Sequence, residues 1–96
     1  MSHLFVFAEI TPKPKYFSKA EKAIIDIVNP TREEAGCHAF SLLKGEEGKR
    51  LYLSEQWSDQ AALDAHYAKE YTKAVFKNYD QWLSQPVVIT KMHRLA

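Results

Sequence analysis

The sequence predicts an α+β fold, a ferredoxin-like sandwich with the element order βαββαβ. Short apolar runs with a period of two, typical of strands, occupy residues 3–11, 37–44, 50–57 and 87–95. Apolar residues at helical spacing fill most of the two long intervals between them. The two middle strands are separated only by the short loop Gly45-Glu46-Glu47-Gly48, which favours a hairpin.

The first predicted strand, residues 3–11, has two different faces. Alternation places Leu4, Val6, Ala8 and Ile10 on one face and Phe5, Phe7 and Glu9 on the other. Both faces are largely apolar, so we expect this strand to be covered on both sides. The segment Thr11-Pro12-Lys13-Pro14 ends it.

The first predicted helix starts near Lys15. Its apolar stripe consists of Phe17, Ala20, Ile24, Ile27 and Val28. We expect Pro30 to kink or end the helix, with Asn29 able to cap a last turn through Ala35. Gly36 is the expected left-handed stop.

After the hairpin, Ser58 is the expected N-cap of a second helix, with Asp59 favourable in its first turn. This helix should run to about Leu83, with a break around residues 68–71. Its second part is expected to bury Tyr71, Val75, Phe76, Tyr79, Trp82 and Leu83. Pro86 ends the helix, and the last strand follows.

Two helices can cover only one face of such a sheet. The other face would carry Phe5, Phe7 and Tyr52. So apolar a face predicts a partner, most simply a second copy packed sheet to sheet in a homodimer.

Composition limits the classes of function. A length of 96 residues predicts one domain spanning residues 1–96. Thirteen basic and twelve acidic residues give a net charge of +1, which argues against nucleic-acid or membrane partners. The lone Cys37 excludes an intrachain disulfide, and His3, His38 and His93 lack metal-ligand spacing, so no metal is expected. No apolar run reaches membrane-spanning length and Met1-Ser2 resembles no signal peptide, so we expect a cytoplasmic location.

The segment from Glu55 to His66 carries the strongest indication of a site. Glu55 and Trp57 share one strand face, and His66 follows on the second helix. If that helix folds back on the sheet, the three side chains converge in an aromatic-walled space, which is typical of a small-molecule pocket.

Each of these residues has a functional and a structural interpretation. Histidine is the usual general acid or base of proteins, so His66 is a candidate general base, or else a hydrogen-bonding residue that holds helix to sheet. Glu55 would orient His66, or be a satisfied acid at a strand end. Trp57 would stack on a planar substrate, or be the largest core residue. Further candidates for the substrate-binding walls, each of which could instead be core, are Leu53, Tyr67, Phe76 and Phe40.

An ordered set of short motifs resembles the antibiotic biosynthesis monooxygenase family across nearly the whole chain. The motifs are Ala8-Glu9-Ile10, Pro30-Thr31-Arg32, Glu33-Glu34-Ala35-Gly36-Cys37, Ser54-Glu55-Gln56-Trp57, Leu63-Asp64-Ala65-His66 and the ending Met92-His93-Arg94-Leu95-Ala96. The resemblance implies a dimeric α+β barrel with a pocket between sheet and helices in each subunit. It also implies cofactor-independent oxidation of quinol-like or polyketide aromatics, haem degradation or quorum-signal processing, depending on the branch.

Departures from the family patterns narrow the branch. The polyketide-oxidising members have an asparagine where this chain has Leu53, four residues before Trp57. The haem-degrading members have asparagine, tryptophan and histidine at positions that correspond here to Ala8, His66 and Phe76. The chain is most similar to the small quinol-monooxygenase-like branch.

We therefore expect a cofactor-independent monooxygenase that oxidises a small electron-rich aromatic, without metal or flavin. His66 would be the base, Glu55 would orient it and Trp57 would form a wall of the pocket. Two alternatives stay open: a non-catalytic dimer that binds a small hydrophobic metabolite, and a haem-binding or haem-degrading protein.

Overall fold

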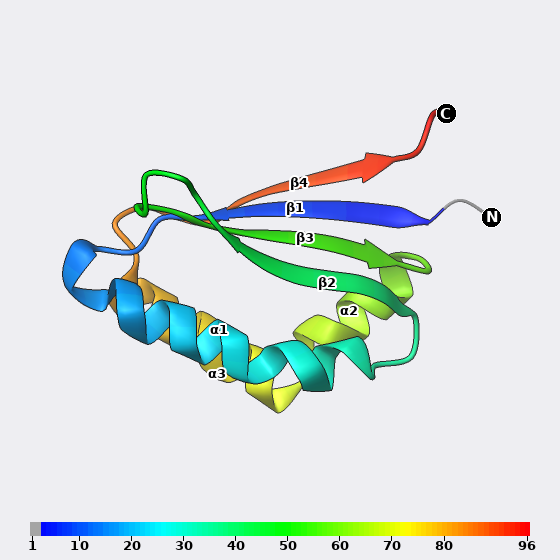
Figure 1. The fold of residues 1–96 in the computed structure, drawn as a ribbon. Coiled ribbons are helices and arrows are strands. Elements are labelled where there is room, and N and C mark those ends of the chain that lie inside the picture. Colours follow the sequence, from blue (N-terminus) through cyan, green and yellow to red (C-terminus); the bar gives the residue numbers. More distant parts are fainter. Residues whose placement is uncertain (1–2) are drawn as a thin grey trace.

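A computed structural model of the chain describes residues 3–96, so the expectation for Met1 and Ser2 lies outside the described residues. Its elements are β1 (Leu4–Ile10), the 3₁₀ turn η1 (Pro14–Tyr16), α1 (Phe17–Arg32), β2 (Cys37–Lys44), β3 (Leu51–Trp57), α2 (Gln60–Tyr67), α3 (Glu70–Trp82) and β4 (Val88–His93). The strands form one antiparallel sheet in the order β2-β3-β1-β4. Figure 1 shows all the helices on one face of this sheet. The predicted ferredoxin-like α+β architecture is confirmed.

The predicted strand faces are also confirmed. Leu4, Val6, Ala8 and Ile10 of β1 are all buried beneath the helices. On β3, Leu53, Glu55 and Trp57 share that face, and each is less than a tenth exposed. The antiparallel register pairs Val6 with Glu55 and Ala8 with Leu53, so the buried rows of the two strands lie side by side.

Helix α1 packs on the sheet through Ala20, Ile24 and Ile27, as its apolar stripe predicts. Of the two effects expected of Pro30, a kink or an end of the helix, the end is not found, because α1 continues to Arg32. Pro30 stands in the last turn, where it cannot donate the helical bond to the Asp26 carbonyl, but only Thr31 and Arg32 of the helix follow it. The backbone N–H of Glu33 then donates to the Pro30 carbonyl at 3.2 Å, and a separate turn that includes Ala35 is closed by the Cys37 N–H, which donates to the Glu34 carbonyl at 3.1 Å.

Gly36 has a positive φ of +84°, but it is not the helix stop that the sequence predicts, because α1 ends earlier with Glu33 as a right-handed C-cap and Gly36 lies in the turn before β2. It also meets α2 closely: a Cβ built on Gly36 would lie only 2.6 Å from the Cβ of Ala62. The Ser58 N–H donates to the Gly36 carbonyl at 2.8 Å. The turn before β2 is therefore tied directly to the start of α2.

The cap of α2 differs from the prediction by one residue. Asp59 is the N-cap, and its carboxylate accepts a hydrogen bond from the Ala62 N–H at 2.9 Å. The hydroxyl of Ser58 is engaged elsewhere, 2.7 Å from Nε2 of His38. The predicted break in the helical segment is confirmed, since α2 ends at Tyr67 and α3 begins at Glu70.

Helix α3 buries fewer side chains than predicted. Val75, Tyr79 and the following Leu83 are buried, whereas Tyr71 and Trp82 are half-buried. Phe76, also expected to be buried, is 39% exposed. The edge strand β4 is exposed along its whole length.

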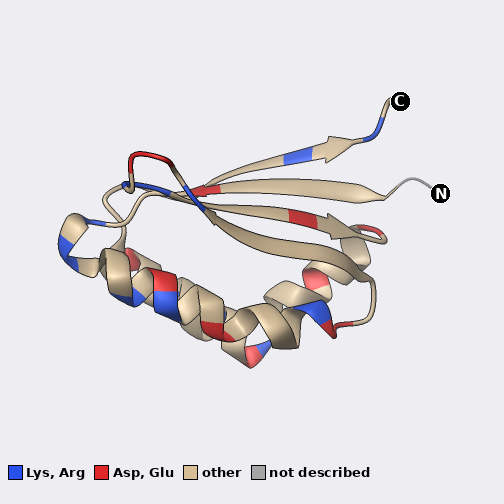
Figure 2. Cartoon of the chain, viewed as in Figure 1, with Lys and Arg blue, Asp and Glu red and all other residues tan. Residues whose placement is uncertain are grey.

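The face of the sheet away from the helices has the apolar side chains that the sequence predicts there. The register places Phe5 beside Gln56 and Met92, and Phe7 beside Ser54 and Thr90. Phe7 stacks on Tyr52, with ring centroids 5.5 Å apart. Figure 2 shows charged residues mainly on the helices and in the β2–β3 loop, with few on the strands. Within residues 3–96, no helix is long and apolar enough to cross a membrane.

Candidate functional site

A narrow cavity lies between the sheet and the helices. Most of its apolar walls are formed by side chains from four places: Ala8 and Ile10 of β1, Ile24 and Ile27 of α1, Val75 and Tyr79 of α3, and, at the start of β4, Val87 just before the strand and Ile89 within it. Its polar side chains come from Glu55, His66, Tyr67 and Thr72. The empty space of the cavity, together with the solvent at its mouth, is about 430 Å³, and little of it is wide enough for a water molecule. A thin apolar slot with few polar groups suits a flat ligand better than a bulky one.

His66 is held from behind by a carboxylate. Nδ1 of His66 lies 2.9 Å from Oε2 of Glu34, and the side chains are only 4% and 5% exposed. Oε2 of Glu34 also accepts a hydrogen bond from the Tyr71 hydroxyl. Since Nδ1 is engaged, Nε2 is the ring nitrogen left for a ligand in the cavity.

Three elements bring these groups together. Glu34 follows the end of α1, His66 lies in the last turn of α2 and Tyr71 in the first turn of α3. The break between α2 and α3 lets His66 and Tyr71 approach the same carboxylate from different directions. The Gly36 contact with α2 fixes the distance between the two segments.

Glu55 lies on the sheet side of the same cavity. Its Oε1 accepts a hydrogen bond from Nε1 of Trp57 at 2.9 Å. Burial raises the pKa of the Glu55 carboxyl from its ordinary 4.5 to about 7, against the opposing effect of the Trp57 bond and with a smaller contribution from Glu34. At neutral pH this carboxyl is therefore partly protonated, and can then donate a hydrogen bond as well as accept one.

We expect Glu55→Gln to remove a pH dependence of stability. The folded protein keeps the Glu55 proton up to a pH of about 7, whereas the unfolded chain loses it near 4.5. Unfolding therefore releases a proton between these values, and the free energy of unfolding falls as the pH rises through them. Glutamine still accepts the Trp57 bond but does not ionise, so above about pH 7 the variant should be more stable, by at most about 3 kcal/mol.

Denaturant unfolding of wild type and variant across this pH range measures the effect. The difference should vanish below about pH 4.5, where both states of the wild type are protonated. The control is Glu47→Gln, which removes an exposed carboxylate of the hairpin loop and should leave the curve unchanged. If the free energies of unfolding of wild type and Glu55→Gln run parallel with pH, Glu55 has the same pKa in the folded and unfolded states, and the prediction is wrong.

Six of the candidate residues line the cavity: Phe40, Leu53, Glu55, His66, Tyr67 and Phe76. Trp57 does not, contrary to its expected role as a wall. Its indole is fully buried and lies behind the site, bonded to Glu55, with its ring centroid 4.9 Å from that of His66. Trp57 therefore supports the two polar side chains instead of facing a ligand.

The expected orientation of His66 by Glu55 is also wrong, because Glu34 is the acid bonded to His66 and Glu55 is bonded to Trp57. Sequence reasoning missed Glu34, Tyr71 and Thr72 as parts of the site. Glu34 lies 32 residues before His66, in a charged pair with Glu33 that resembles an ordinary solvated turn. Its place two residues before Gly36, where the chain reverses toward the sheet, was the available signal.

Comparison with known proteins agrees with this fold. The sequence profile of the antibiotic biosynthesis monooxygenase family matches residues 3–78. The chain belongs to this family. As a family member it is 31% identical over 90 residues to the Mycobacterium tuberculosis protein named “Putative monooxygenase Rv0793”, covering 93% of this chain and 88% of the relative.

Solved structures of family members and similar proteins have the same fold. The structure of Rv0793 superimposes with a TM-score of 0.94 at 27% identity, covering 99% of this chain and 97% of that one. The structure of PA3566 from Pseudomonas aeruginosa gives a TM-score of 0.93 at 32% identity, covering 100% and 97% of the two chains. The polar cluster described above thus lies in a family scaffold shared from end to end.

Proposed function

We propose that this family member is a cofactor-independent monooxygenase that oxidises a small electron-rich aromatic, such as a quinol, in the cavity between sheet and helices. The observation that carries the proposal is a buried histidine bonded to a carboxylate through Nδ1, at the polar end of an apolar slot. Membership of the family and the description of its mycobacterial relative as a monooxygenase support the same class of reaction.

In this proposal the substrate supplies every electron. Nε2 of His66 takes the proton of a phenolic hydroxyl, and the phenolate passes an electron to O₂. The two radicals combine at a ring carbon to give a peroxide, which takes up a proton. Loss of water then leaves a carbonyl at that carbon, so one oxygen atom enters the product, the other leaves in water, and the ring carbon gives up its hydrogen.

The remaining side chains of the cavity act on binding and orientation. Glu55, when protonated, can donate a hydrogen bond to a substrate oxygen, and Thr72 and Tyr67 are further polar contacts. Phe40, Phe76 and the aliphatic walls exclude water from the reacting ring. Phe76 and Ile89, at 39% and 44% exposed, are the most solvent-accessible apolar side chains of the wall.

Oxygen consumption by purified protein, freed of metal and flavin, tests the proposal with a panel of single-ring quinols and phenols. We expect substrate-dependent uptake of one O₂ per product molecule and incorporation of labelled oxygen from O₂ into the product. A protein that binds these compounds tightly and consumes no oxygen would contradict it.

The second candidate is a non-catalytic binding protein for a small hydrophobic metabolite. The narrow apolar cavity favours it equally, and saturable binding without turnover is its expected result. For the haem alternative, addition of haem should produce a visible absorption band. Absence of that band would rule out the haem alternative.

We also propose that the protein works as a homodimer through the open face of the sheet. Phe5, Phe7 and Tyr52 on that face are half-buried in the single chain, and Leu43, Val88 and Met92 are each more than two-fifths exposed. The strand registers place all six on the same side. An apolar sheet of this extent favours a second copy over solvent.

A further inference from the structure

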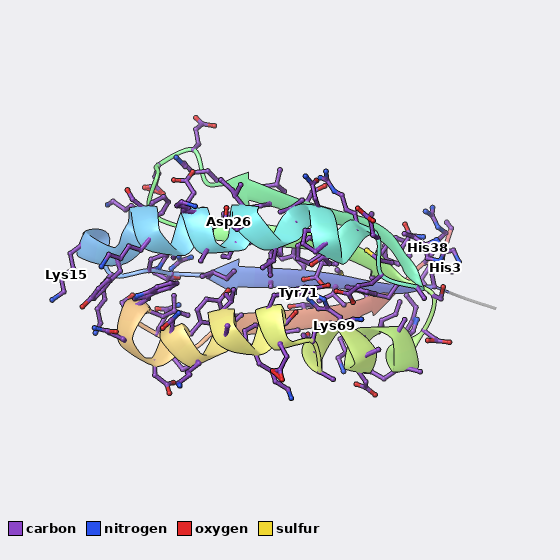
Figure 3. All side chains as sticks on the ribbon, turned by 90° about the horizontal axis from the view of Figure 1, so that it is seen from below. His3, Lys15, Asp26, His38, Lys69 and Tyr71 are labelled. Atoms are coloured by element: carbon purple, nitrogen blue, oxygen red, sulfur yellow. The ribbon has the colours of Figure 1, made fainter. Side chains whose placement is uncertain are left out.

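The Glu34 side chain lies between His66 and the outer surface of the protein. Toward the cavity, Oε2 of Glu34 lies 2.9 Å from Nδ1 of His66. Toward the outside, Glu34 forms part of a separate surface hollow lined also by Asn29, Pro30, Glu33, Lys69 and Tyr71. Figure 3, a view onto the helical layer, shows Tyr71 between α1 and α3 with Lys69 nearby, and His3 and His38 at the end of the sheet.

We propose that Glu34 is a positioning residue that holds a proton on Nδ1 of His66, so that the Nε2 lone pair faces the cavity, and that Tyr71 holds Glu34 in place. This inference rests on the proposed function for its consequence in catalysis. Its structural content, the tautomer of His66, does not depend on the activity.

The tautomer follows from what each partner can donate. A neutral imidazole has one N–H and one lone pair, and an ionised carboxylate only accepts hydrogen bonds. With Nδ1 facing Glu34, the stable arrangement has the proton on Nδ1, because the opposite tautomer would direct a lone pair at the carboxylate. Both side chains are buried, so water competes little for this bond.

Tyr71 limits the freedom of Glu34. Its hydroxyl donates to the oxygen that also faces His66. Burial and the bond to Glu34 raise the pKa of Tyr71 to about 12, so the hydroxyl keeps its proton at neutral pH. The other carboxylate oxygen, Oε1, is buried and has no hydrogen-bond partner within residues 3–96, so Tyr71 and His66 supply the bonds that fix the carboxylate.

Glu34→Gln is the first test, with Glu33→Gln as the matched control. Glutamine keeps the shape of Glu34 but can donate as well as accept, so it no longer selects one tautomer. NMR chemical shifts of the His66 ring nitrogens should show the Nδ1–H form in wild type and in the control, and an increased Nε2–H form in Glu34→Gln. Turnover should fall roughly 10²-fold or more, mainly in kcat, the direction seen when a carboxylate partner of a catalytic histidine is replaced.

The outer hollow provides a second test. In Glu34→Ala, added formate should enter from solvent and take the place of the missing carboxylate. It should restore the Nδ1–H form of His66 and raise kcat in proportion to the fraction of protein that binds formate. Chloride at equal ionic strength should do neither. Tyr71→Phe, which keeps the Glu34 charge, should give a smaller change in the same direction and is informative even if the other variants fold poorly.

An Nε2–H tautomer in wild type, or a tautomer unchanged in both Glu34→Gln and Tyr71→Phe, would overturn the inference. Failure of the proposed function has a different signature. In that case wild type consumes no oxygen, while the nitrogen shifts still respond to Glu34→Gln and to formate.

Discussion

His66→Ala is expected to lower turnover by roughly two to four orders of magnitude, the usual contribution of a general acid–base group. The alanine variant leaves the Glu34 carboxylate buried without its imidazole partner, so some loss of stability is also expected. His66→Asn separates the two effects, because its amide nitrogen can take the place of Nδ1 and donate to Glu34 but cannot act as a base. Turnover and melting temperature should be measured on the same preparation.

Two further measurements sharpen this test. His38→Ala removes an exposed histidine that is bonded to Ser58 outside the cavity, and should keep wild-type turnover. The wild-type rate should fall in acid, because a protonated imidazole can no longer accept a proton. A folded His66→Asn protein with unchanged turnover would end the assignment of His66 as the base and strengthen the binding-protein alternative.

Phe7→Lys is expected to convert the proposed homodimer into a monomer, an aggregate or an unfolded chain. Phe7 lies in the central strand β1, stacked on Tyr52, on the face that we assign to the interface. Pairing two copies would take the introduced ammonium groups out of water, which costs several kcal/mol, and pairing with Glu9 on the same face of β1 would offset only part of that cost. Light scattering coupled to size-exclusion chromatography measures the change in mass.

The control for this substitution is Ile25→Lys. Ile25 is 54% exposed on α1, on the helical side of the molecule. Its replacement by lysine introduces the same charge away from the open face of the sheet. It should leave the mass in solution unchanged. If Phe7→Lys is as dimeric and as stable as wild type, the interface lies on another surface.

The strands and their faces could be predicted because alternation and burial agree. In β1 and β3 every second residue is apolar or, at Glu55, hydrogen-bonded to a neighbour on its own strand, so a single register satisfies the sheet. The ends of the helices were harder to predict than the strand faces. Ser58 and Asp59 are both good caps, and which of them bonds to the backbone depends on His38, which occupies the Ser58 hydroxyl.

The candidate site was predicted only in part. The convergence of His66 and Glu55 on one cavity follows from local spacing and from the fold. The partners of these residues do not, since the bond between His66 and Glu34 joins residues from separate elements and needs the path of the chain after α1. Pro30 misled the prediction there: a helix ending earlier would have placed Glu34 differently.

The absence of a side chain at Gly36 has a consequence for any effort to reshape this protein. A methyl group there would collide with Ala62 and would also strain a backbone held at φ +84°. The collision would move α2 away from the turn that carries Glu34, and an increase of about an ångström is enough to break a hydrogen bond. Selection experiments that broaden the substrate range should therefore tolerate many residues at the cavity mouth and yet recover glycine at position 36. Only glycine lets α2 lie close enough to the turn for His66 to reach Glu34.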